Sequence, residues 1–188
     1  LAAPKTQSAT QTMENRARIR LWLYFTACTV YLLDRLSKIW VMGALGDYDQ
    51  IVVIPNFFNL IHIRNQGAAF GVLSEADPWV RMTVLVGAAL LAVCALAYFV
   101  WQTAGNPHYG GWKLRAGLAL ILGGAAGNIH DRIVYGNVVD FLDFYAGSWH
   151  WYTFNIADTA ISVGTGLLLL DLWQSASRER TAHASETA

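Results

Sequence analysis

Charged residues are scarce in this sequence. Lysine, arginine, aspartate and glutamate make up 14% of the 188 residues, whereas hydrophobic residues make up 55%. A soluble domain carries about 25% charged residues, so this chain lacks the charge that would cover a globular surface in water. The shortage predicts an integral membrane protein. Positive and negative charges also cancel, so the charge balance indicates no nucleic-acid partner.

Motifs for metal or covalent chemistry are missing as well. The five histidines show no HExxH or other paired spacing, so we expect no metal site and no cofactor. No serine stands in a nucleophile-elbow sequence, and no glycine-rich phosphate loop follows a strand. The two cysteines, Cys28 and Cys94, lie inside apolar runs and are expected to pack there as small hydrophobic residues.

Four long apolar runs are present, and each predicts a membrane-spanning helix. They cover about residues 21–45, 82–101, 114–135 and 152–173. The second run has no charged residue and would rise about 30 Å as a helix, the thickness of the hydrocarbon layer. A signal peptide is the alternative for the first run. Its apolar stretch is interrupted by charges, however, and three more runs follow.

Basic residues flank the runs on one side only. They precede the first run, separate the second from the third, and follow the fourth, at Arg16, Arg18, Arg20, Lys113, Arg115, Arg178 and Arg180. The connections 46–78 and 136–151 carry one basic residue and six acidic ones. Both termini are therefore predicted to be cytoplasmic. Residues 1–15 are expected to be a disordered tail or tag remnant, 16–175 a single transmembrane domain, and 176–188 a cytoplasmic tail.

The two outer connections differ in character. The first contains two short β-type stretches, 50–54 and 58–63, around Pro55 and Asn56, which predict a small β-cradle on the outer membrane surface. The second, 137–146, is expected to form a short interfacial helix, followed by a belt of Trp149, Trp151 and Tyr152. The predicted fold class is an all-α membrane protein with four transmembrane helices, an extracytoplasmic β-cradle and one interfacial helix.

Ionisable residues inside the apolar runs are candidates for function. Asp34 and Lys38 are four residues apart and can form an ion pair within one helix, for which a structural role is favoured. Arg35 points to another face and is expected to extend toward the outer headgroups. In the third run Asn128, Asp131 and Arg132 share a helical face, either as a site or as a structural network.

Small residues precede that polar group. The segment "GGAAG", residues 123–127, is a small-xxx-small pattern that lets another backbone approach closely. Helix packing is the simpler reading of these glycines.

Two further acids are Asp140, at the end of the second outer connection, and Asp158, just inside the start of the fourth run. In one continuous helix they would stand about 27 Å apart. The sequence "AGSWHW" breaks the run, so we expect them to face each other from separate elements near the outer interface. Two carboxyl groups that close would share one proton, giving an acid and a base. The alternative for Asp158 is an acid favoured by a helix dipole. Asn155 is expected on the same helical face, and Asp143 is expected to be a solvated surface acid.

Five ordered motifs resemble one known family. "LLDRLSK" (32–38), "NQGAAFG" (65–71), "GGAAGNIHDRI" (123–133), "VVDF" (138–141) and "FNIAD" (154–158) are similar, in order and spacing, to the motifs of bacterial lipoprotein signal peptidase (signal peptidase II). The resemblance extends over about residues 20–172.

The resemblance implies an aspartic endopeptidase of the bacterial cytoplasmic (inner) membrane. Such an enzyme removes the signal peptide from prolipoproteins, cutting before the diacylglyceryl-modified cysteine. Membrane lipids and the inhibitor globomycin are its other implied partners. By motif match, Asp140 and Asp158 are the catalytic pair. The substrate site is implied to comprise Asn65, Gly124, Asn128, Arg132 and Asn155, and the supporting polar positions Asp34, Lys38 and Asp131.

Two rival functions remain to be weighed. A channel or transporter would need polar residues through the whole membrane depth, whereas here they cluster at the outer end and the second run has none. A catalytically inactive lipoprotein-binding protein is disfavoured because the motifs are complete.

Overall fold

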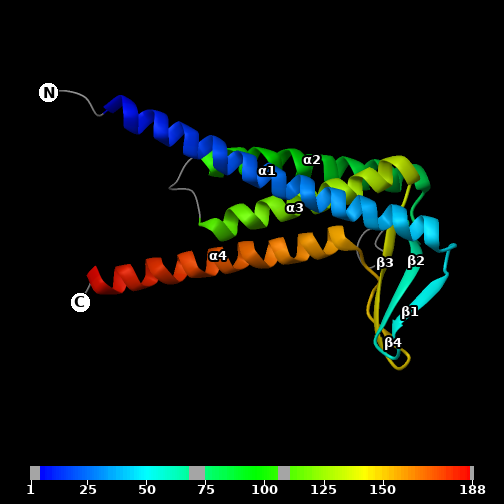
Figure 1. Ribbon diagram of the computed structural model, residues 1–188. Helices are drawn as coiled ribbons and strands as arrows, with labels where there is room; N and C mark the ends of the chain where they lie inside the picture. Colours follow the sequence, from blue (N-terminus) through cyan, green and yellow to red (C-terminus); the bar gives the residue numbers. More distant parts are fainter. Residues whose placement is uncertain (1–4, 68–74, 106–110, 187–188) are drawn as a thin grey trace.

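The computed structural model describes residues 5–67, 75–105 and 111–186. Four helices lie side by side as a bundle: α1 (Lys5–Ala44), α2 (Pro78–Gly105), α3 (Trp112–Tyr135) and α4 (Ile156–Glu186). A small sheet lies at one end of the bundle, and the start of α1 and the end of α4 lie at the other (Figure 1). Its strands are β1 (Gln50–Ile54), β2 (Phe58–Asn65), β3 (Val138–Ala146) and β4 (Trp149–His150).

Helix α3 is the central helix, because it contacts α1, α2 and α4 more extensively than any other helix contacts its neighbours. Its glycines allow the close approach that the sequence predicts. A Cβ atom on Gly123 would overlap the carbonyl oxygen of Ala27 in α1, and one on Gly127 would lie 2.5 Å from the Asp34 carboxylate. Gly124 faces α4 instead, where a Cβ would overlap the carbonyl oxygen of Ala157. The glycines therefore let two neighbouring backbones pack directly onto α3.

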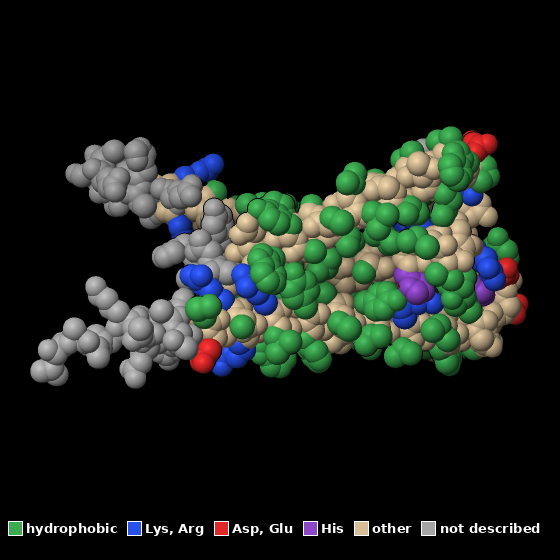
Figure 2. Space-filling model, turned by 90° about the horizontal axis from the view of Figure 1, so that it is seen from above, with side chains coloured by type: hydrophobic (Ala, Val, Ile, Leu, Met, Phe, Trp, Pro, Cys, Tyr) green, Lys and Arg blue, Asp and Glu red, His purple; other side chains and the backbone are tan. Residues whose placement is uncertain are grey.

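Within the described residues, two helices are long and apolar enough to cross a membrane, over Pro78–Ala104 in α2 and Ile156–Arg178 in α4. Helices α1 and α3 bury charged side chains inside the bundle, namely Asp34, Arg35, Lys38 and Asp131. Figure 2 shows hydrophobic side chains over the middle of the bundle and several Lys and Arg side chains at the end that holds the termini. That α1 and α3 also cross the membrane, which would make four spans, stays a prediction.

The strand pair of the first connection is confirmed. β1 and β2 form an antiparallel hairpin, and β2 extends two residues beyond the predicted end. The predicted interfacial helix at 137–146 is wrong, because β3 occupies this segment and pairs antiparallel with β2. Its Val, Phe and Tyr residues favour a strand. The edge of β2 that does not face β1 also supplies backbone hydrogen-bonding partners for β3, which the sequence of 137–146 alone does not reveal.

The break at "AGSWHW" is a second hairpin. Tyr145 pairs with His150 and Ala146 with Trp149, which leaves a two-residue loop between β3 and β4. Gly147 has φ +63° in this loop, a left-handed conformation that such short hairpin loops require and that glycine adopts without strain. The chain then returns along β3 and enters α4.

Both chain ends are more helical than expected. Helix α1 already begins at Lys5, so the prediction of a disordered segment is wrong from Lys5 to residue 15. No proline or glycine interrupts the sequence between Lys5 and Gly43, which lets the helix continue upstream. Helix α4 likewise continues to Glu186, through most of the predicted tail 176–188. Residues 1–4 and 187–188, and residues 68–71 of the "NQGAAFG" motif, lie outside the described residues.

A Gly123→Ala substitution tests the helix contact. The added methyl group would force α1 away from α3, so we expect a loss of about 1–3 kcal/mol in the free energy of unfolding. The control is Gly166→Ala in α4, where a Cβ would meet nothing within 4 Å and where higher helix propensity should stabilise by about 0.5–1 kcal/mol. Unfolding in detergent micelles measures both, and equal effects would contradict the packing.

Candidate active site

The start of α4 positions Asp158. Asn155 is the residue before the helix, and its Oδ1 accepts the backbone N–H of Asp158 at 2.9 Å. Asp158 Oδ2 in turn accepts the backbone N–H of Asn155 at 3.3 Å. This reciprocal arrangement is a capping box, so Asn155 caps the helix. The prediction that Asn155 and Asp158 share a helical face is therefore wrong. Asp158 does lie in the first turn, as expected.

Strand β3 positions Asp140. This residue pairs with Ile63 of β2, and only 2% of it is exposed. Its carboxyl group accepts two amide hydrogen bonds, from Asn65 Nδ2 at 3.0 Å and from Asn155 Nδ2 at 2.6 Å. Asp140 is therefore clamped between the end of β2 and the cap of α4.

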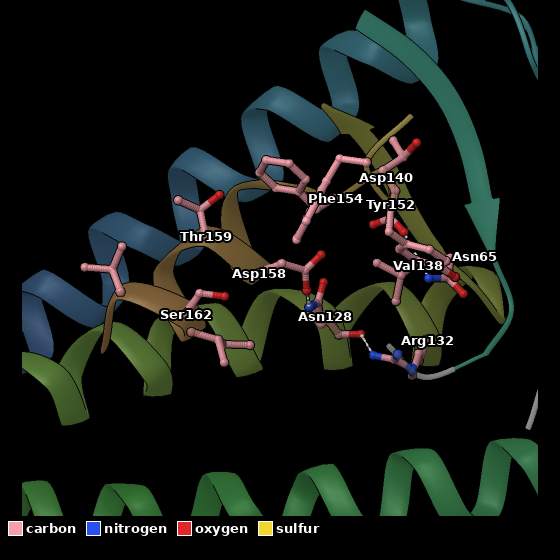
Figure 3. A pocket seen from close by; sticks show the side chains of 14 residues that line it. Asn65, Asn128, Arg132, Val138, Asp140, Tyr152, Phe154, Asp158, Thr159 and Ser162 are labelled. Atoms are coloured by element: carbon pink, nitrogen blue, oxygen red, sulfur yellow. Dashed lines mark hydrogen bonds between the residues drawn. The ribbon is translucent and has the colours of Figure 1, made fainter. Parts of the chain in front are cut away.

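Two asparagines connect the two acids. Asn128 of α3 donates through Nδ2 to Asp158 Oδ1 at 2.7 Å. Its Oδ1 accepts from Asn155 Nδ2 at 3.3 Å, and the same nitrogen donates to Asp140. The acids thus belong to one hydrogen-bonded network, with Asn128 and Asn155 between them. Figure 3 shows Asn128 beside Asp158.

A buried charge cluster lies behind this network. Lys38 Nζ is 2.7 Å from Asp34 Oδ2 and 2.9 Å from Asp131 Oδ2, and all three side chains are fully buried. The predicted Asp34–Lys38 pair is confirmed. Lys38 also donates to Asn128 Oδ1 at 3.1 Å. The expectation that Arg35 extends toward the headgroups is wrong, since it is buried and paired with Asp131.

The cluster also holds the backbone next to each acid. Asp34 Oδ1 accepts the N–H of Ala157 at 2.9 Å, one residue before Asp158. Asp131 Oδ2 accepts the N–H of Val139 at 3.2 Å, one residue before Asp140. Lys38 forms ion pairs with both of these carboxylates, so its ammonium group stabilises the positions of α4 and β3 together, with Arg35 as the second cation on Asp131.

The network opens onto a cavity of about 610 Å³. Of the predicted residues, Asn65, Asn128, Arg132, Asp140 and Asp158 line it. Gly124 does not; it packs against Ala157 beneath the Asp158 turn. Nine lining residues were not predicted: Val138, Trp151, Tyr152, Thr153, Phe154, Thr159, Ile161, Ser162 and Val163. Most are apolar or aromatic, and in the sequence they resemble lipid-facing or interfacial positions.

Two predicted polar residues have partners that their spacing does not indicate. Arg132 donates to the carbonyl oxygens of Gly67 at 3.1 Å and Asn128 at 3.3 Å, so it bridges α3 and the segment after β2. Asp143 is not the solvated surface acid that we expected. It is 3% exposed and hydrogen-bonded to Asn59.

The two acids differ in their electrostatic surroundings. Burial and the nearby charge of Asp158 raise the pKa of Asp140 to about 7, against the opposing effect of the hydrogen bonds from Asn65 and Asn155. Near neutral pH, Asp140 can therefore keep a proton beside an ionised partner. No group of three or more metal-ligating side chains occurs within the described parts of the chain.

Known proteins resemble this chain in fold and in sequence. A bacterial membrane enzyme solved by the in meso method at 2.3 Å resolution superposes with a TM-score of 0.72 and 30% identity, covering 83% of this chain and 90% of that one. The model of the signal peptidase (SPase) II family matches residues 26–174. The chain belongs to this peptidase family.

Lipoprotein signal peptidases are among its similar relatives. The one from Solibacter usitatus is 44% identical over 154 residues, which are 82% of this chain and 92% of the relative. The one from Burkholderia cenocepacia strain HI2424 is 46% identical over 144 residues, 76% of this chain and 81% of the relative. The similarity therefore spans most of the length of both relatives.

Replacing Lys38 tests the charge cluster. Lys38→Met would leave the buried carboxylates of Asp34 and Asp131 without their shared cation, and we expect a loss of about 3–5 kcal/mol in unfolding free energy. Arg64→Met removes the cation of an exposed ion pair with Asp47 and should cost at most about 1 kcal/mol. Chemical unfolding in micelles compares the two variants, and a Lys38→Met loss as small as the control would refute the role.

Proposed function

We propose that this protein is an aspartic endopeptidase in which Asp140 and Asp158 activate water against a peptide bond. The observation that carries the proposal is that two carboxyl groups from separate elements line one cavity under unequal conditions. Asp140 is almost fully buried and has a raised pKa, whereas Asp158 is partly exposed. An acid and a base at neutral pH need such a difference.

The groups of the site define a mechanism without a covalent intermediate. Asp158 takes a proton from a water molecule while Asp140 gives its proton to the scissile carbonyl oxygen, which produces a neutral gem-diol. On collapse, Asp158 returns its proton to the leaving amide nitrogen as the C–N bond breaks. Asp140 recovers a proton from one hydroxyl group of the gem-diol. The pair ends in its starting protonation state, so no further reactant is required.

The proposed substrates are prolipoproteins carrying a diacylglyceryl-modified cysteine, cleaved just before that cysteine. The relatives named lipoprotein signal peptidase support this substrate class. The cavity fits it chemically, because its lining combines the acids and amides with apolar residues such as Ile161, Val163 and Phe154. An apolar signal helix and lipid chains can contact the latter while the peptide bond reaches the acids. We expect globomycin to compete for the same cavity.

The proposed setting is the bacterial cytoplasmic membrane, with four spans, lipid around the bundle, and both termini cytoplasmic. Basic side chains at the end of the bundle that holds the termini support this orientation (Figure 2). Asp140 belongs to β3 and Asp158 to the first turn of α4. Both acids then lie near the outer membrane face, at the end of the bundle where Figure 1 shows the sheet. This depth suits substrates whose cleavage site follows a membrane-embedded signal helix.

Substitution of either acid tests the pair. We expect Asp140→Asn and Asp158→Asn each to lower the cleavage rate of a lipid-modified prolipoprotein about a thousandfold or more, because each removes one proton-transfer group. Asp47→Asn changes an exposed acid near the sheet and should leave the rate unchanged. Near-normal turnover by either dyad variant would sink the proposal.

The pH dependence tests the proton assignment. Since the pKa of Asp140 is raised to about 7, kcat/KM should fall about tenfold per unit above that pH as Asp140 loses its proton. Asn65→Leu removes a hydrogen bond that favours the ionised form, so the alkaline limb of its profile should move to higher pH. A limb that stays in place or moves lower would contradict Asp140 as the acid.

A further inference from the structure

A polar cluster that the proposed mechanism does not use lies on the sheet. Asp143 follows Asp140 by three positions in β3, and the pleat directs side chains at that spacing to opposite faces of a strand. Asp143 is nonetheless 3% exposed. A carboxylate is costly to bury unless it is well hydrogen-bonded. The hydrogen-bond partners of Asp143 therefore indicate its structural role.

The Asp143 carboxylate joins three neighbouring strands. Asn59 of β2 stands directly opposite in the register and donates through Nδ2 to Asp143 Oδ2 at 3.0 Å. His150 of β4 places Nδ1 at 2.9 Å from Oδ1 and 3.1 Å from Oδ2. A carboxylate only accepts hydrogen bonds, so His150 is the donor. β4 has two residues, and this contact adds a side-chain link to its short ladder.

The ring of His150 has a second support. It stacks on Tyr145 with the ring centroids 5.0 Å apart and the planes 8° from parallel. The Tyr145 hydroxyl accepts the backbone N–H of Asn56, at the turn between β1 and β2, at 2.9 Å. The side chain of His150 is 51% exposed. Contacts with Asp143 and Tyr145, and not general burial, therefore hold the ring in place.

The residues that follow His150 form one wall of the cavity. We call residues 151–154, which are Trp151, Tyr152, Thr153 and Phe154, the aromatic wall; all four line the cavity. Phe154 is anchored by backbone hydrogen bonds with Leu142, at 2.8 and 3.2 Å. At the other end, the Trp151 N–H donates to Phe144 at 2.8 Å, directly after the His150 contact.

We propose that Asp143 and His150 are a positioning pair that fixes the aromatic wall where the substrate contacts it. This inference rests on the proposed function, because the wall has a kinetic role only if the cavity takes a peptide substrate. Neither residue touches the reacting atoms. Loss of the pair therefore weakens substrate binding and leaves the proton transfers of Asp140 and Asp158 intact.

Steady-state kinetics on a lipid-modified prolipoprotein tests the pair. His150→Ala should raise KM about tenfold, the effect expected from losing a charge-assisted hydrogen bond, while kcat and the alkaline limb of the pH profile stay as in wild type. His150→Asn should restore most of the wild-type KM, because its amide nitrogen lies close to the position of Nδ1. Asp143→Asn should raise KM on its own but add nothing to His150→Ala, since both remove one interaction.

Hydrogen exchange tests the same pair without substrate. In His150→Ala, backbone amides of the aromatic wall should exchange faster than in wild type, whereas those of α3 and α4 should not change. His150→Asn should exchange like wild type. The matched control is Glu75→Gln, an exposed acid outside the sheet, which should alter neither KM nor exchange.

The outcomes separate this inference from the proposed function. An unchanged KM in His150→Ala, an equal defect in His150→Asn, or unchanged exchange in the wall would overturn the positioning pair, even if the dyad variants are inactive. If wild-type protein fails to cleave any lipid-modified prolipoprotein, the proposed function fails instead. Exchange then still decides whether Asp143 and His150 hold the wall.

Discussion

The ammonium group of Lys38 is the contact on which the rest of the site depends. It lies between two fully buried carboxylates, Asp34 and Asp131, at 2.7 and 2.9 Å. Each carboxylate uses another oxygen lone pair to hold a backbone amide, one in α4 and one in β3. Without the cation, Asp34 would be an uncompensated charge in a low-dielectric interior, and Asp131 would keep only its ion pair with Arg35. With Lys38 in place, Asp34 of α1 and Asp131 of α3 fix the starts of α4 and β3.

Asn128 and Asn155 connect the two acids by hydrogen bonds. Asn128 and Asn155 are each donor and acceptor, so each can join a charged partner to a neutral one. Asn155 caps α4 with its oxygen and contacts Asp140 with its nitrogen. Any shift of α4 therefore moves a hydrogen bond of the acid on β3. The helix bundle and the sheet therefore share one polar network that positions both acids.

Spacing along the chain predicted the local features well. The Asp34–Lys38 pair, the two strands around Pro55 and the small-residue surface of α3 depend on neighbours in the sequence, and the structure confirms them. Arg35 and Asp143 were predicted incorrectly, because their partners lie 96 and 84 residues away in sequence.

The errors at longer range have related causes. Strand β3 was predicted as a helix because its conformation depends on the free edge of β2, which no local pattern reveals. The aromatic wall was missed because Trp and Tyr at a membrane interface have the same composition whether they face lipid or a cavity. A helix-capping asparagine beside an aspartate was visible in "FNIAD", however, and could have identified Asn155 as the cap.

Asp140 precedes the β3–β4 hairpin loop and Asp158 follows β4. Side chains of α1 and α3 hold the backbone next to each of these acids. A partly synthesised chain that ends at Phe154 contains Asp140 and Asn65 but lacks Asp158 and Asn155, the second amide that donates to Asp140. In the proposed mechanism, catalysis therefore requires the chain to be synthesised at least as far as Asp158. A shorter chain would have no assembled pair of acids with which to cut a peptide.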